Sequence, residues 1–222
     1  MVFGTDVSFF QARVDWKKLR IDGNRFFYAR CTEGVVPDKT HDIHLVNGRG
    51  EDQAGGSYGV GHPSQKVDDL VDAFLARASL VKGQLRPVLD IETLATGPDG
   101  RKHIPDNAGA WSDAWCELVK SYLVAKFPES FGARRGPIIY ASASYFLTMC
   151  AQRPSVGGPF GWDWWCADYT GLPNKPTHLG GVELPPYVAH QFAGNVTMKG
   201  QVGLWDRDVI YDGEDGLDRL RL

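Results

Sequence analysis

The sequence lacks several features that would place it in a common functional class. Its 222 residues contain no apolar run near the roughly 20 residues that a membrane helix needs, so we expect no membrane insertion. The opening segment MVFGTDVSFF has no basic stretch followed by an apolar core and a cleavage site, so it does not read as a secretory signal. Positive charge is limited, because 24 Lys and Arg stand against 27 Asp and Glu, a net charge of −3. With no basic run, we expect no nucleic-acid binding.

Cysteine is also sparse. No C-x-x-C pair and no zinc-ligand spacing is formed by the four cysteines, Cys31, Cys116, Cys150 and Cys166. The sequence leaves their pairing open, and we favour buried, reduced thiols. His41 and His44 have no acidic ligand at a matching spacing, so we expect no metal and no other cofactor.

The composition that remains is that of one globular domain. Apolar residues make up 43% of the chain and charged residues 23%. A chain of this length buries about 70% of the surface that it exposes when unfolded, so it needs no disulfide or metal for stability. Aromatic residues reach 12%, with seven Trp, which suits both a large core and stacking against sugar rings or bases. We expect a single domain over residues 1–222, and a monomer.

Short apolar runs alternate with helical patterns along the chain. Asp15–Ile21 predicts a short helix with Asp15 as its N-cap. Apolar residues between Val67 and Ala78 recur at helical spacing, and Asp106 is a candidate cap for a long helix through Leu123. Eight runs predict strands: Val2–Val7, Phe26–Cys31, Gly56–Val60, Pro87–Ile91, Pro137–Tyr140, Trp164–Ala167, Tyr187–Phe192 and Trp205–Tyr211.

This alternation predicts a mostly parallel sheet with helices outside it, and eight strands favour a closed, irregular (β/α) barrel. Convincing helices lie between strands only in the first half of the chain. Residues 169–186 are rich in Pro and Gly and predict a loop.

Acidic residues recur where the predicted strands end. Asp6 ends the first strand, Glu33 follows the second, Asp90 and Glu92 end the strand 87–91, and Asp206 lies in the last. In a parallel barrel the C-terminal strand ends meet on one face, and side chains two residues apart point the same way. Crowded carboxyls raise at least one pKa, which gives the proton donor and charged partner that glycoside hydrolysis uses. Solvated strand ends or helix caps are the alternative interpretation.

Several segments resemble the glycoside hydrolase family 25 lysozymes. GTDVSFFQARVDW (4–16) is similar to the family's opening motif, YARCTEG (28–34) to its second strand, and PVLDIE (87–92) to its most diagnostic D-x-E motif. The later matches follow in the family's order, so that the resemblance covers essentially the whole chain: IIYAS (138–142), WWCADY (164–169), AHQFAG (189–194) and GLWDRDVIYDG (203–213).

The resemblance implies an N-acetylmuramidase with a flattened, irregular (β/α) TIM-like barrel. Such an enzyme cleaves the β-1,4 bond between N-acetylmuramic acid and N-acetylglucosamine in peptidoglycan. By motif, Glu92 would be the general acid and Asp90 would orient or stabilise the reacting centre. Asp6 and Asp206 would complete the acidic cluster. Whether a carboxylate or the substrate's own acetamido group attacks the sugar stays open.

Several sugar-contacting positions depart from the family's pattern. Phe9 and Phe10 stand in the first motif where a Trp or similar residue is common, and the family's closing D-x-N reads Asp206, Arg207, Asp208. The family's Y-H-F, A-Q-Y and W-Q-Y segments read Tyr-Gly-Val (58–60), Ala-Asp-Tyr (167–169) and His-Gln-Phe (190–192). These changes concern the preferences of individual subsites more than the reaction.

We assign substrate binding to seven residues and weigh core packing against it for the aromatic ones. Glu33 would bind sugar hydroxyls or pair with Arg30. The full set is Glu33, Tyr58, Tyr140, Trp165, Asp168, Tyr169 and Gln191.

Three other functions fit the same acids. They are a glycosidase on another amino-sugar polymer such as chitin, a metal-dependent barrel phosphodiesterase, and a non-catalytic glycan-binding barrel. The absence of a recognised signal indicates an enzyme made in the cytoplasm that acts on the bacterial cell wall. This setting is typical of a phage endolysin, released through a holin-like lesion or carried in the virion. We expect no separate wall-binding domain.

Overall fold

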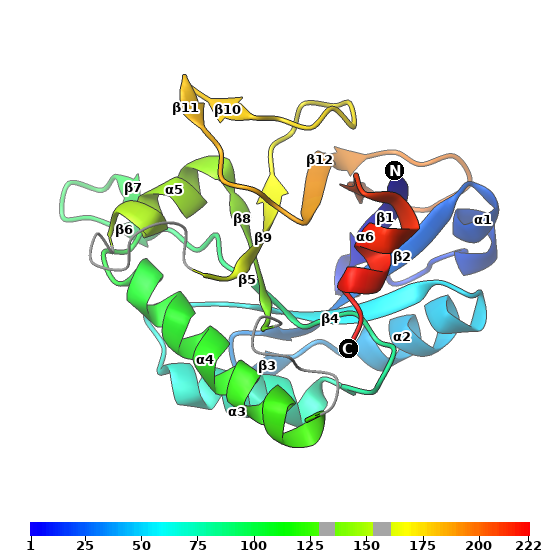
Figure 1. The fold of residues 1–222 in the computed structure, drawn as a ribbon, viewed down its shortest axis with the longest axis horizontal. Coiled ribbons are helices and arrows are strands. Elements are labelled where there is room, and N and C mark those ends of the chain that lie inside the picture. Colours follow the sequence, from blue (N-terminus) through cyan, green and yellow to red (C-terminus); the bar gives the residue numbers. More distant parts are fainter. Residues whose placement is uncertain (129–135, 153–160) are drawn as a thin grey trace.

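The computed structural model describes residues 1–128, 136–152 and 161–222 and has an eight-stranded barrel at its centre (Figure 1). The barrel strands are β1 (Val2–Val7), β2 (Asn24–Glu33), β4 (Ala54–Val60), β5 (Val88–Asp90), β8 (Ile138–Ser142), β9 (Asp163–Ala167), β12 (Ala189–Val196) and β13 (Trp205–Ile210). Their order is β1-β13-β12-β9-β8-β5-β4-β2, and β2 closes the barrel by pairing with β1. β13 is antiparallel to both neighbours, and the other barrel pairs are parallel. The predicted irregular α/β barrel is confirmed.

Additional short strands lie outside the eight-stranded barrel. β3 (Val36–Pro37) pairs with the end of β2. Two small hairpins, β6–β7 (Ala95–Thr96, Lys102–His103) and β10–β11 (His178–Leu179, Val182–Glu183), lie in connecting segments. Figure 1 shows the β10–β11 hairpin projecting from the barrel, within the stretch 169–186 predicted as a loop.

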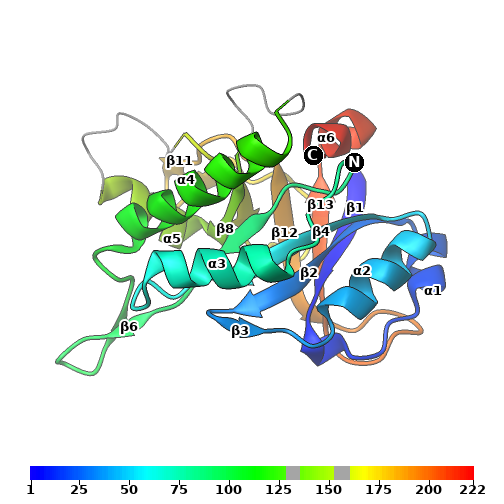
Figure 2. The ribbon, with the colours of Figure 1, turned by 90° about the horizontal axis from the view of Figure 1, so that it is seen from below.

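The helices cover the outside of the barrel. Their bounds are α1 (Trp16–Ile21), α2 (His41–Gly50), α3 (Val67–Arg77), α4 (Ala108–Lys126), α5 (Ala143–Ala151) and α6 (Gly213–Arg219). Figure 2 shows α3 and α4 side by side, with α1 and α2 over another part of the wall. Among the described residues, no helix combines the length and apolarity required to cross a bilayer.

Side chains on each barrel strand alternate between two cores. On β2, Phe26 and Tyr28 pack into the barrel interior, whereas Phe27 and Ala29 face α1 and α2. The interior core is closed at one end by Leu217 of α6. A larger core joins the opposite wall to α3, α4 and α5. The other end of the interior is left to polar side chains, which positions the site described below.

Several local predictions are confirmed and one is wrong. β1 has the predicted bounds, and the Asp15 side chain caps α1 by accepting the N–H of Lys18 at 2.9 Å. Asp106 does not cap α4: Asn107 is the N-cap residue, and its side chain donates to Pro63 O at 2.9 Å instead.

The second half of the chain carries two helices that were not predicted. α5 is short and rich in apolar residues, so it lacks the contrast between faces that marks an amphipathic helix. α6 is only seven residues long. Three cysteines are buried, as favoured, and the fourth is half-buried: Cys31, Cys116, Cys166 and Cys150, respectively.

Candidate active site

An acidic cavity of about 840 Å³ opens at the end of the barrel where the parallel strands finish. Asp6 and Asp90 reach it from the C-terminal ends of β1 and β5, and Glu92 follows β5. Asp206 belongs to the beginning of β13, which meets the same rim because this strand runs in the opposite direction. The structure therefore brings all four sequence-predicted acids to one cavity.

Asp6 is held by a short chain of hydrogen bonds. Gln191 Nε2 donates to Asp6 Oδ2 at 2.7 Å, and the Tyr140 hydroxyl donates to Gln191 Oε1 at 2.8 Å. Burial raises the pKa of Asp6 well above its ordinary value, the charge of Asp206 raises it further, and the bond from Gln191 partly opposes both. Asp6 therefore retains a proton more readily than an ordinary aspartate.

Asp206 is anchored through its backbone and its carboxyl group. The hydroxyl of Thr5 donates to Asp206 O at 2.6 Å, and Asp206 Oδ1 accepts the N–H of Asn195 at 3.0 Å. Burial raises the pKa of Asp206, and the bond from Asn195 lowers it. Asp206 is thus the acid whose negative charge is supported by a backbone donor.

Asp90 and Glu92 differ in environment although they are two residues apart. Asp90 Oδ1 is buried and has no hydrogen-bond partner among the described residues. Burial raises the pKa of Asp90 well above its ordinary value, and the charges of Glu92 and Asp6 add to the effect. Glu92 is more exposed and stands at the cavity mouth; partial desolvation raises its pKa, and the charges of Asp206 and Glu33 raise it further.

The backbone after Glu92 is fixed from two sides. The Tyr145 hydroxyl on α5 donates to Thr93 O at 3.0 Å, and the Thr93 hydroxyl donates to Gly61 O at 3.0 Å. Thr93 also lies 3.1 Å from His62 Nδ1. These contacts from α5 and from the segment after β4 hold Glu92 in its position at the mouth.

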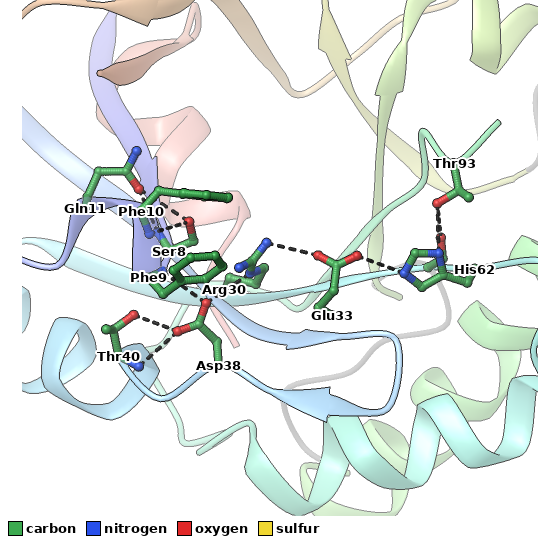
Figure 3. Close-up of polar contacts among 11 residues, drawn as sticks. Ser8, Phe9, Phe10, Gln11, Arg30, Glu33, Asp38, Thr40, His62 and Thr93 are labelled. Carbon is green, nitrogen blue, oxygen red and sulfur yellow. Dashed lines mark hydrogen bonds and ion pairs between the residues drawn. The ribbon is translucent and has the colours of Figure 1, made fainter. Parts of the chain in front are cut away.

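A network of charged side chains follows one wall of the cavity (Figure 3). Arg30 donates through Nη1 to Glu33 Oε2 and through Nε to Asp38 Oδ2, each at 3.0 Å. His62 Nε2 lies 2.8 Å from the other Glu33 oxygen. Glu33 therefore pairs with Arg30, one of the two roles expected for it, while its side chain stays 44% exposed at the cavity.

Aromatic side chains form much of the cavity lining. Tyr58, Tyr140 and Trp165 line it but are nearly buried, so packing inside the barrel takes most of their surface. Trp165 contacts Tyr140 edge to face, with ring centroids 5.2 Å apart. Tyr169 is different, because 61% of it is exposed at the rim.

The geometry suits acid–base chemistry on a glycosidic bond. A mouth carboxyl with a raised pKa supplies a proton, and neighbouring carboxyls supply negative charge close to it. Within the residues that the structure describes, no group of three or more His, Cys, Asp or Glu side chains is arranged to hold a metal ion.

Comparison with protein families agrees with this chemistry. The profile described as Glycosyl hydrolases family 25 matches residues 5–201, which is most of the chain. The chain belongs to glycosyl hydrolase family 25. It is therefore a glycoside hydrolase, whereas no curated protein sequence matches it.

Solved structures share the fold of this family 25 hydrolase at low sequence identity. A bacterial lysozyme from Streptomyces coelicolor is 21% identical with a TM-score of 0.75, covering 99% of this chain and 96% of that one. A family 25 glycosyl hydrolase from Bacillus anthracis is also 21% identical, with a TM-score of 0.72 and coverages of 100% and 94%. The catalytic domain of an endolysin from a Listeria monocytogenes bacteriophage is 19% identical, with a TM-score of 0.65 and coverages of 99% and 97%.

One predicted binding residue of the family 25 hydrolase lies outside the cavity lining. Asp168 does not line the cavity; its N–H donates to Gln191 O at 3.1 Å, and its carbonyl oxygen accepts from His190 Nε2 at 2.8 Å. Both contacts use backbone atoms of Asp168, and they hold the end of β9 against β12. The other six predicted binding residues line the cavity: Glu33, Tyr58, Tyr140, Trp165, Tyr169 and Gln191.

Sequence reasoning missed several polar and apolar residues of the lining. Arg30 was named only as a partner of Glu33. It lies two residues after Tyr28 and four after Phe26, on the same inward face of β2. Phe10 was noted only as a departure from the family's motif. The remaining missed residues include Ser8, Gln11, Thr93, Asn195 and Leu204.

Proposed function

We propose that this family 25 glycoside hydrolase is a lysozyme of the N-acetylmuramidase type. Its substrate is bacterial peptidoglycan, and it hydrolyses the β-1,4 bond between N-acetylmuramic acid and N-acetylglucosamine. The observation that carries the proposal is the convergence of Asp6, Asp90, Glu92 and Asp206 on one cavity of the barrel. The lysozyme and endolysin among the similar folds support the same substrate.

Glu92 is the proposed general acid. It stands at the cavity mouth, where a glycosidic oxygen reaches it, and desolvation with nearby negative charge raises its pKa. A carboxyl that keeps its proton at moderate pH donates it to the leaving oxygen as the bond from that oxygen to the anomeric carbon breaks.

The other three acids support the charge that develops at the anomeric carbon. Asp206 keeps a backbone donor on its carboxylate, so it is the member best prepared to stay ionised. Asp90 and Asp6 are more deeply buried and hold protons more readily; Asp90 orients the reacting centre, and Asp6 is fixed by Gln191. The negative charge that remains in the cavity stabilises the oxocarbenium-like transition state.

The proposed substrate-binding residues lie along the cavity. The glycan strand contacts Glu33, Tyr58, Tyr140, Trp165, Tyr169 and Gln191, and the backbone of Asp168 holds the end of β9 beside Gln191.

The proposed setting is the bacterial cell wall, where the protein acts as a monomer. It is made in the cytoplasm and reaches the wall through a holin-like lesion or in a virion, as proposed for an endolysin.

Digestion of purified peptidoglycan tests the proposal. The wild type releases new reducing ends, and Glu92→Gln lowers kcat by at least about 100-fold because it removes the transferable proton while keeping the shape of the side chain. Glu183→Gln is the matched control, since Glu183 is exposed on the β10–β11 hairpin away from the cavity lining. Equal rates for Glu92→Gln and the wild type would remove Glu92 from the role of general acid.

A further inference from the structure

His62 lies next to the cavity but does not line it. The residue follows β4, and 26% of its side chain is exposed. Its Nε2 lies 2.8 Å from Glu33 Oε1, and its Nδ1 lies 3.1 Å from the Thr93 hydroxyl (Figure 3). Glu33 and Thr93 both line the cavity, and Thr93 directly follows Glu92. The imidazole ring therefore joins two parts of the cavity lining that come from separate segments.

The backbone that carries His62 is fixed on both sides of the residue. The N–H of Gly61 donates to Asp90 O at 2.7 Å, which ties this segment to the end of β5. His62 O accepts the N–H of Gln65 at 2.8 Å. The ring therefore has a fixed base next to the strand that carries Asp90.

Gly34 leaves the space that the ring occupies. A Cβ on Gly34 would lie 3.0 Å from His62 Cδ2 and 2.6 Å from Gln65 Oε1. Gly34 also has a φ of +57°, a left-handed conformation that residues with a side chain rarely adopt. The turn after Glu33 therefore lets the imidazole approach β2 closely, as its bond to Glu33 requires.

The hydrogen bonds identify the atoms that carry protons. A carboxylate only accepts, so His62 Nε2 donates to Glu33. The Thr93 hydroxyl has one proton and two neighbouring acceptor positions, Gly61 O at 3.0 Å and His62 Nδ1. An imidazolium also carries a proton on Nδ1, which it donates to Thr93, and the Thr93 proton is then free for Gly61. All three hydrogen bonds form together in this state, and the chain from Glu33 through His62 to Thr93 is complete.

Thr93 passes this restraint on to Glu92. Its carbonyl oxygen accepts the Tyr145 hydroxyl at 3.0 Å, so Thr93 is held both at its backbone and, by His62, at its side chain. The carboxyl of the preceding residue, Glu92, has to stay within hydrogen-bond reach of the glycosidic oxygen. A displacement of about 1 Å in a reacting group costs up to about 100-fold in rate, so a small shift of this segment is expensive.

We infer that His62 is a positioning residue for the reaction: by bonding to Glu33 and Thr93 at once, it fixes the segment that carries Glu92 relative to β2. The inference rests on the proposed function, because it concerns how the general acid of that reaction is held. His62 acts through Thr93 and not on the substrate, since it does not line the cavity.

A double-mutant cycle on peptidoglycan digestion tests this inference. His62→Ala removes the ring, and Thr93→Val removes the hydroxyl while keeping the shape of the side chain. Each change should lower kcat about 5- to 20-fold, and the double variant should be no slower than the slower single variant, because both changes break one chain. KM should change by less than about 2-fold in His62→Ala. His178→Ala is the matched control with unchanged kcat, because His178 is exposed on β10 and does not line the cavity.

A measurement without substrate separates positioning from the proposed function. By NMR relaxation, the backbone order parameter of Thr93 in His62→Ala should fall below the value of about 0.85 that is typical of rigid backbone and that we expect in the wild type. Thermal unfolding checks that each variant is folded. His62→Gln, which keeps a donor for Glu33 but not the contact with Thr93, replaces His62→Ala if that protein fails to fold.

Three results would each overturn the inference: an unchanged kcat in His62→Ala, effects of the two single variants that multiply in the double variant, or an unchanged order parameter at Thr93. A wild type that cleaves no peptidoglycan, together with a lower order parameter in His62→Ala, would remove the proposed function and leave standing the hold of His62 on this segment.

Discussion

At the scale of single residues, the barrel interior contains more carboxyl side chains than the proposed reaction uses. Asp208 lies two residues after Asp206 on β13 and is fully buried, with no hydrogen-bond partner for either carboxyl oxygen among the described residues. Burial raises its pKa well above the ordinary value, and the charges of Asp6 and Asp206 raise it further. The family motif that the sequence resembles has Asn at this position, so a neutral, protonated Asp208 has nearly the same shape and charge.

The first prediction concerns Asp208→Asn. The raised folded-state pKa means that the wild type loses stability as the pH rises above the unfolded value of about 4, by up to about 1.4 kcal/mol per pH unit until the folded pKa is reached. The Asn side chain does not titrate, so the variant does not lose stability in this way. Its free energy of unfolding should equal that of the wild type near pH 3 and exceed it near pH 7. Urea unfolding across this range measures the difference. Lower stability of the variant at pH 7 would show that Asp208 is ionised and paired.

The second prediction concerns the pH dependence of activity. Glu33 is one of the charges that raise the pKa of Glu92, and a general acid must be protonated. Glu33→Gln should therefore move the alkaline limb of kcat/KM to lower pH by a fraction of a unit. The acid limb should stay where it is if Asp206 governs it. A shift of the alkaline limb to higher pH, or an equal shift in Glu183→Gln, would contradict the claim that the charge of Glu33 raises the pKa of Glu92.

At the scale of elements, small residues on β4 give the interior rings their space. A Cβ on Gly56 would lie 2.3 Å from Tyr28 Cε1, inside the barrel, and Leu85 would be 2.9 Å away on another side. Tyr28 cannot move aside easily, since its ring also packs on Trp165 with centroids 5.0 Å apart. Gly56 thus leaves room inside the barrel for the large ring of Tyr28, its register partner on β2.

The third prediction follows from this packing. Gly56→Ala should destabilise the protein by about 1–3 kcal/mol, which is the usual result of overfilling a packed core. Gly50→Ala on α2 is the matched control: a Cβ there meets nothing within 4 Å, and in a helix the change should be neutral or stabilising by up to about 1 kcal/mol. Chemical unfolding of both variants tests the pair, and equal stabilities would show that Tyr28 relaxes without cost.

Elements with a clear apolar spacing in the sequence were predicted more closely than elements without one. β1 and α3 have clear apolar spacing and fixed neighbours in sequence, so their positions were predicted closely. β2 extends beyond its predicted bounds of 26–31 because Thr32 and Glu33, although polar, continue to pair with β3 and β4, and Asn24 pairs with Phe3 of β1. α5 could not be predicted because a short, mostly apolar helix has no polar face to mark it.

At the scale of the whole molecule, strand direction determines the site. The acids at the ends of β1 and β5 could be placed from the rule that parallel strands end on one face. Asp206 begins its strand and belongs to the same cavity only because β13 is antiparallel to β1 and β12. Periodicity carries no information on direction, so this acid was placed by resemblance to the family. The network of Arg30, Asp38 and His62 depends on side chains from separate segments and left no local signal.

The most direct test of the central claim is the identity of the new reducing end. Peptidoglycan is digested with the wild type and with Glu92→Gln, reduced with borohydride and analysed by mass spectrometry. The account predicts reduced muramic acid from the wild type and none above background from Glu92→Gln. Reduced glucosamine would mean that the enzyme cleaves the other glycan bond, and faster cleavage of chitooligosaccharides than of peptidoglycan would contradict the proposed substrate.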